Sequence, residues 1–154
     1  MMLMCIFWTG AKRQQAFSFD KFKEKLKKSV AAGSTGVHDD SLPNTEREVA
    51  EQMAAFNAAI GSNSRLNTYN YCMIGRNLGE LLKGGKRGKK LIDFVQHYLP
   101  AKHYSGSQIY FLIDLYKVAQ EYSQLMFVTL GIGVLKTKFR YVKLALTNDK
   151  EFWQ

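Results

Sequence analysis

The chain is poor in cysteine, with only two in 154 residues. Cys5 and Cys72 stand far apart and belong to no repeated spacing. This scarcity excludes a disulfide-rich secreted scaffold. We expect two reduced thiols in an intracellular protein, with a disulfide between them as the open alternative.

Long hydrophobic runs are also missing. The most apolar stretch, residues 1–8, is much shorter than the roughly 20 residues that cross a bilayer, and it lacks the basic start of a secretory signal. We interpret it as a buried terminal segment or an upstream extension of the true start, with a membrane-touching patch as a third option. A membrane partner is therefore not expected.

Catalytic and metal-binding motifs are absent from the sequence. It contains no P-loop, no HExxH, no GxSxG and no strand-associated GxGxxG. The three histidines, His38, His97 and His103, are not joined by close cysteine pairs of the kind that hold zinc. We therefore expect a protein that binds rather than catalyses, with no cofactor and no metal.

Positive charge is plentiful. The chain has 22 lysines and arginines against 13 acidic residues, a formal net charge of +9 and a pI near 9.6. Such a domain commonly meets phosphate, either in nucleic acid or on an anionic membrane surface. The 46% hydrophobic content supports a sizeable core, and the length fits one domain.

Apolar residues recur at helical spacing along most of the chain, and sustained strand-type alternation is absent. We predict an all-α fold, a compact bundle of five or six helices containing a helix-turn-helix-like unit. Residues 123–133 fit either a short helix or a strand. The expected helices cover residues 14–30, 45–61, 69–83, 88–99, 105–121 and 134–146.

Composition divides the chain into three parts. Residues 1–30 form a basic N-terminal arm with a helix, and residues 31–44 are rich in Gly, Ser, Asp and Pro, which is typical of a linker. Residues 45–154 form the helical core domain. Thr45 and Glu48 match a capping box at its start.

Local signals also mark other boundaries. Gly84 and Gly85 suit the end of a helix, and Pro100 forbids continuation of another. Either Ser105 or Ser107 is suited to cap the next helix. Gly75 and Gly79, four residues apart, favour close packing between helices in water.

The segment from Lys83 to Lys90 is the most unusual in the sequence, with five basic residues and three glycines in eight positions. Glycines let the backbone approach a ligand, and a following helix N-terminus favours anions. We interpret the segment as a phosphate clamp; the alternative is a solvated loop between two helices.

The next elements follow the order of a helix-turn-helix unit, in which the second helix enters the DNA major groove. Gln108 is placed to read adenine, and Lys102, His103, Tyr104, Ser105 and Ser107 to touch the phosphate backbone. The second helix carries only one cation, Lys117, so a core or dimer face is the alternative.

Residues 71–122 resemble phage- and plasmid-borne helix-turn-helix proteins, in which a helix, a basic glycine-containing loop, a second helix, a polar turn and a tyrosine-rich helix follow each other. The resemblance implies DNA binding in a mobile-element or viral setting, such as transcription regulation. The matching residues are Ile74, Gly75, Leu78, Glu80, Leu81, Gly88, Phe94, Leu99, Tyr110 and Tyr116.

The sequence thus predicts a nucleic-acid-binding protein, with DNA favoured over RNA, and lysines at 21–28 and 136–143 adding phosphate contacts. The alternative is an adaptor or homo-oligomeric subunit that uses the aromatic helix 107–122 and the apolar runs 1–8 and 125–135. The candidate contact residues are Lys83, Lys86, Arg87, Lys89, Lys90, Lys102, His103, Ser107, Gln108, Lys117, Lys136, Lys138 and Arg140.

Overall fold

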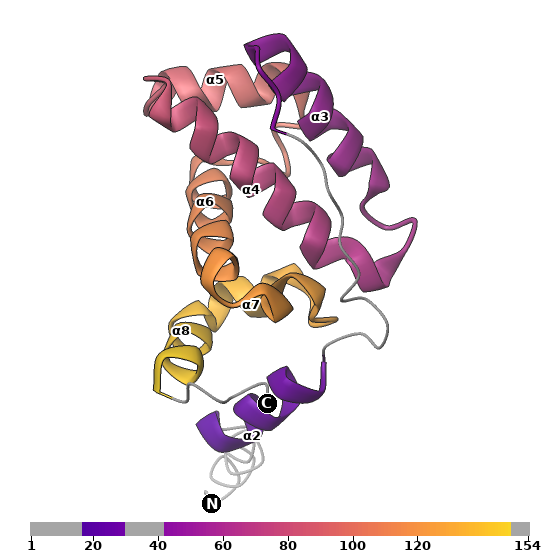
Figure 1. Ribbon diagram of the computed structural model, residues 1–154, viewed down its shortest axis with the longest axis vertical. Coiled ribbons are helices and arrows are strands. Elements are labelled where there is room, and N and C mark those ends of the chain that lie inside the picture. Colours follow the sequence, from indigo (N-terminus) through magenta and orange to yellow (C-terminus); the bar gives the residue numbers. More distant parts are fainter. Residues whose placement is uncertain (1–16, 30–41, 149–154) are drawn as a thin grey trace, which may run out of the picture.

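The computed structural model describes residues 17–29 and 42–148. Within these ranges the protein is all-α, with seven α-helices, two 3-10 helices and no strand (Figure 1). The α-helices are α2 (Phe19–Lys28), α3 (Glu46–Ala59), α4 (Asn67–Lys83), α5 (Lys89–Tyr98), α6 (Gly106–Glu121), α7 (Ile132–Thr137) and α8 (Phe139–Asn148), and the 3-10 helices are η1 (Ser64–Leu66) and η2 (Ser123–Phe127).

The described residues hold one helix more than the six expected, because the helix predicted over 134–146 is two helices. Lys138 leaves the helical region with φ −107° and ψ 17°, which separates α7 from α8. Residues 123–127 are a 3-10 helix, so the strand alternative for 123–133 is wrong.

The predicted helix start signals are confirmed. The Thr45 hydroxyl accepts a hydrogen bond from the Glu48 amide at 3.1 Å, and the Glu48 carboxylate accepts one from the Thr45 amide at 3.1 Å. Of the two serines proposed to cap α6, Ser105 does so, by accepting from the Gln108 amide at 3.2 Å. These caps satisfy amides that a helix start otherwise leaves without partners.

The core lies where α4 crosses α6, and α3 covers α4 on another side (Figure 1). Ile74, Leu78, Leu112 and Leu115 are fully buried at this crossing. Gly75 allows the close approach, because a Cβ at this position would overlap the carbonyl of Leu112. Close packing through one of the two predicted glycines is therefore confirmed.

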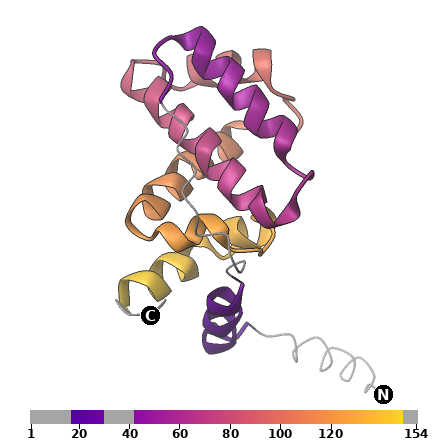
Figure 2. The same cartoon turned by 45° about the vertical axis from the view of Figure 1, so that its right-hand side comes forward.

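The ends of the molecule carry different helices. The turn between α4 and α5 lies at one end, and α2 and α8 lie at the other, in both views (Figures 1 and 2). α2 buries Phe22 and Leu26, and the Ser29 carbonyl accepts hydrogen bonds from the Thr129 amide and hydroxyl, both at 2.8 Å. The helix expected in the N-terminal arm is thus anchored on the body, while residues 31–41 of the predicted linker lie outside the described residues.

Tyr104 is buried, contrary to its predicted contact with a phosphate backbone. Its side chain is 1% exposed, and its hydroxyl donates to Asn57 Oδ1 at 2.7 Å. The Gln96 amide donates to the Tyr104 carbonyl at 2.9 Å. Tyr104 therefore joins the turn before α6 to α3 and α5 and has no surface for a ligand.

Replacing Tyr104 with phenylalanine is expected to lower the free energy of unfolding by about 1–2 kcal/mol, because Asn57 loses its donor. Burial raises the pKa of Tyr104, so its contribution is complete below the unfolded value of about 10 and is lost as pH rises above it. Urea unfolding at neutral and alkaline pH measures both effects. The variant should lose less stability at alkaline pH than the parent chain.

The control is Tyr98→Phe at an exposed ring. This variant should keep the stability and the alkaline sensitivity of the parent chain. Equal alkaline sensitivity in the Tyr104→Phe variant would contradict the role assigned to this hydroxyl.

Candidate nucleic-acid interface

The turn between α4 and α5 has a defined backbone. The Lys86 amide bonds to the Leu81 carbonyl at 3.0 Å and the Gly85 amide to the Leu82 carbonyl at 3.1 Å, a Schellman motif with Gly85 at φ +102°. Gly88, at φ +54°, donates its amide to the Tyr110 hydroxyl at 3.0 Å. The turn is therefore a fixed connection, held to α6, and its side chains are presented in a set arrangement.

Most cations of this turn already have carboxylate partners. Lys83 lies 3.3 Å from Glu80, Lys86 3.2 Å from Glu46, and Lys89 2.8 Å from Asp93. Each pair cancels the charge that a phosphate would meet. Arg87 and Lys90 are exposed and form no ion pair with a described carboxylate, so they are the cations that the turn leaves for a ligand.

α6 offers little to DNA. Ile109, Leu112 and Leu115 are fully buried, and Gln108 accepts a hydrogen bond from Lys136 at 3.3 Å. One side of α6 is therefore part of the core, and only its other side is open to a ligand. Its exposed side chains carry two carboxylates and one lysine; they are Ser107, Tyr110, Asp114, Lys117, Gln120 and Glu121.

The other predicted contact residues are spread over the surface. Lys102 and His103 are exposed in the turn after α5. Lys136, Lys138 and Arg140 lie in α7, α8 and the residue between them, at the end of the molecule away from the α4–α5 turn (Figure 1). The structure therefore does not bring the predicted residues together on one surface.

Within the described residues, the largest excess of positive over negative charge is at the end formed by α2, α7 and α8. We call the described residues 17–29 and 129–147 the basic end. They hold nine lysines and arginines against two carboxylates, Asp20 and Glu24. Residues 42–128 hold ten cations against seven carboxylates. Lys23 lies 3.8 Å from Asp20, so the basic end has a net excess of positive charge, whereas the charge of the other described residues is more evenly mixed.

Aromatic rings support the cations of the basic end. Lys138 lies 4.2 Å from the ring centre of Phe17, Arg140 4.8 Å from Tyr141 and Lys143 5.0 Å from Phe139. Phe17 also packs on Tyr141 at 4.2 Å, which links α8 to the segment before α2. A ring holds a cation by its quadrupole and leaves the charge intact. These cations therefore keep a charge that is able to attract an anion.

The sequence contains a signal for this arrangement. Phe19 and Phe22 lie close to lysines in the first segment, and Phe139 and Tyr141 lie next to or near Arg140 and Lys143 in the last. Aromatic residues among basic ones in these two segments therefore indicated the basic end. Its assembly depends on the packing of α2 against α8, which no local pattern specifies.

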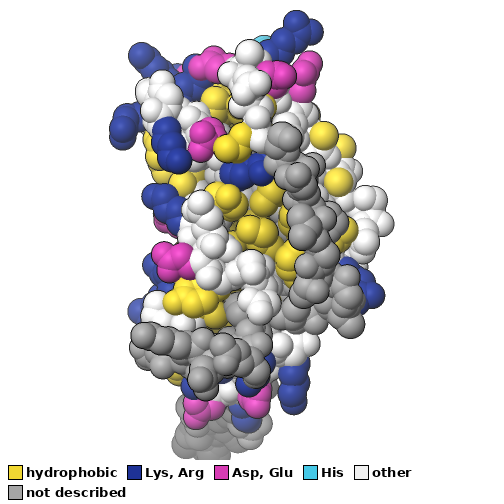
Figure 3. Space-filling model, viewed as in Figure 1, with side chains coloured by type: hydrophobic (Ala, Val, Ile, Leu, Met, Phe, Trp, Pro, Cys, Tyr) yellow, Lys and Arg dark blue, Asp and Glu magenta, His cyan; other side chains and the backbone are white. Residues whose placement is uncertain are grey.

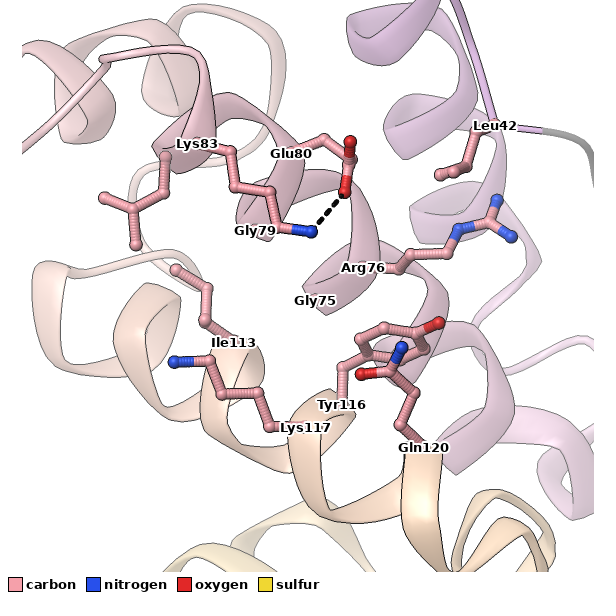
Figure 4. A pocket seen from close by; sticks show the side chains of 11 residues that line it. Leu42, Gly75, Arg76, Gly79, Glu80, Lys83, Ile113, Tyr116, Lys117 and Gln120 are labelled. Atoms are coloured by element: carbon pink, nitrogen blue, oxygen red, sulfur yellow. Dashed lines mark hydrogen bonds and ion pairs between the residues drawn. The ribbon is translucent and has the colours of Figure 1, made fainter.

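A groove of about 340 Å³ runs between α4 and α6 (Figure 4). Lys83 reaches it from α4 and Lys117 from α6, while Gly75 and Gly79 form part of its floor. The Lys83 ammonium is held at Glu80 beside the opening. On the face in Figure 3, lysine and arginine side chains follow the edge above this groove, toward the α4–α5 turn.

The described residues lack two further kinds of feature. No group of three or more His, Cys, Asp and Glu side chains there is arranged to hold a metal ion. No helix there has both the length and the apolar character needed to span a bilayer. Cys72 is fully buried and burial raises the pKa of its thiol, so it is held in the neutral form; Cys5 lies outside the described residues.

Comparison with known proteins adds no family to this description. No protein-family model, no curated protein and no solved structure matches the chain.

Proposed function

We propose that the protein binds nucleic acid through its phosphates, with DNA as the expected ligand, and that it performs no catalysis. The observation that carries the proposal is the basic end, where nine cations face two carboxylates and several of the cations are held by aromatic rings. A duplex is a dense polyanion, and binding releases its condensed counterions. A ligand of this kind implies an intracellular protein.

The contacts proposed here fix position rather than sequence. The resemblance of residues 71–122 to helix-turn-helix proteins favours DNA, but the exposed side of α6 has more carboxylates than cations. We therefore assign the main contact to the basic end. Arg87, Lys90 and Lys102 are secondary phosphate contacts at the other end of the molecule.

A salt titration tests the function. Fluorescence anisotropy of a labelled mixed-sequence duplex is measured between about 50 and 200 mM salt. If about five of the nine cations meet phosphates, the logarithm of the association constant should fall with the logarithm of salt with a slope near −4.5, since each contact contributes about −0.9. Polyglutamate of matched charge is the control and should bind far more weakly.

Two results would count against this function. One is the absence of binding at the lowest salt concentration. The other is equal binding of polyglutamate, because the surface would then attract any polyanion and would have no preference for the phosphate backbone.

A further inference from the structure

α5 carries three rings that are not fully buried, of which Phe94 also packs against the core. Tyr98 is 47% exposed, His97 is exposed and Phe94 is half-buried. The inner side of α5 is anchored separately by Leu91 and Val95, both fully buried. The outer rings form a cluster: the Tyr98 ring centre is 5.2 Å from Phe94 and 4.7 Å from His97.

Positive charge surrounds this cluster. Lys90, Phe94 and Tyr98 are spaced four residues apart, so a cation and two rings follow one another along a single side of the helix. Arg87 precedes them in the turn, and Lys102 follows shortly after the helix. All three cations are exposed and none is paired with a described carboxylate, whereas Asp93 is occupied by Lys89.

The arrangement matches one ligand chemistry. An exposed ring beside unpaired cations is complementary to a molecule with a flat apolar face and a negative charge on the same unit. A nucleotide in a single strand has both, and its base is free to stack on a protein ring. In a duplex the bases are stacked on each other, so only the phosphates would be available to this surface.

We propose that the outer side of α5 binds unpaired nucleotides, with Tyr98 stacking on a base and with Lys90 and Arg87 contacting phosphates farther along the same strand. The proposal rests on the proposed function, because the ligand is again nucleic acid. It adds a second surface, at the end of the molecule opposite the basic end, and a preference for single strands there (Figure 1).

The test compares Tyr98→Ala and Tyr98→Phe with the parent chain on oligothymidine and on a duplex of the same length. Tyr98→Ala should weaken single-strand binding at least fivefold, the lower range for one stacked base, and change duplex binding less than about twofold. Tyr98→Phe keeps a ring and should restore single-strand binding. Thermal melts establish that both variants are folded, as expected for an exposed position.

Each outcome of this experiment has a single interpretation. Unchanged single-strand binding by Tyr98→Ala overturns the stacking role, and salt-dependent duplex binding would then still support the proposed function. An equal loss on both ligands also overturns it, since stacking affects only unpaired bases. A change in oligomeric state by light scattering would show that the rings contact a second copy instead. If the parent chain binds neither ligand, both proposals fail.

Discussion

Replacing Gly75 with alanine is expected to lower the free energy of unfolding by about 3 kcal/mol, the upper range for an overpacked core. The new Cβ would overlap the Leu112 carbonyl and crowd the Cβ of Tyr116, so α4 and α6 must move apart. The neighbouring Ile74 and Leu78 are fully buried and have no room to absorb the shift. For a chain of this size the melting temperature should fall by roughly 10 °C.

Gly79→Ala is the matched control, because Gly79 lies on the same helix and opens on the groove between α4 and α6. No atom lies within 4 Å of a Cβ at this position. Alanine there removes the conformational freedom of glycine in a helix, so stability should rise by about 0.5–1 kcal/mol. Circular dichroism melts and urea titrations of both variants give the comparison. Equal effects at the two positions would contradict the close contact assigned to Gly75.

The elements that sequence predicts best are those defined by neighbouring residues. Thr45 and Glu48 form the predicted capping box, and Gly85 ends α4 in a left-handed conformation that glycine adopts without strain. In both cases the interacting groups lie within five residues of each other. Such signals predict the structure well because they do not depend on contacts with distant parts of the chain.

The break between α7 and α8 shows where periodicity misleads. Leu135, Phe139, Val142 and Leu146 keep helical spacing across it, and the sequence alone favours one helix. The chain turns at Lys138, whose ammonium lies over the ring of Phe17. Phe17 is more than a hundred residues away in sequence, so its position was not available to a local prediction.

The candidate site also combines features that the local sequence predicts with features that only the fold creates. A count of charges identifies residues 83–90 as the most basic window, but it does not show which of these cations are paired with carboxylates. Glu80 and Asp93 lie within one helical turn of Lys83 and Lys89 and were open to prediction. Glu46, the partner of Lys86, belongs to the start of α3 and comes close only in the fold. The basic end likewise exists only once α2 packs on α8.

The contrast between the paired cations of the α4–α5 turn and the basic end predicts the largest effect on binding. A quadruple variant with Lys21, Lys25, Arg140 and Lys143 changed to glutamine should bind a duplex about a thousandfold more weakly near 0.1 M salt. The reason is that each lost phosphate contact removes nearly one unit of the logarithm of the association constant at this salt concentration. The slope of the salt titration should become shallower by about 3. All four side chains are exposed, so the fold should be retained.

The control removes the same number of charges from the α4–α5 turn, by changing Lys83, Arg87, Lys89 and Lys90 to glutamine. Both variants lose four charges from the formal net of +9, so a difference between them reports location and not total charge. Because Glu80 and Asp93 already neutralise two of the four turn cations, at most two phosphate contacts are lost, and duplex binding should fall by less than about a hundredfold. Equal losses would mean that the overall charge attracts DNA without a defined site, and a greater loss in the turn variant would move the interface to the α4–α5 turn.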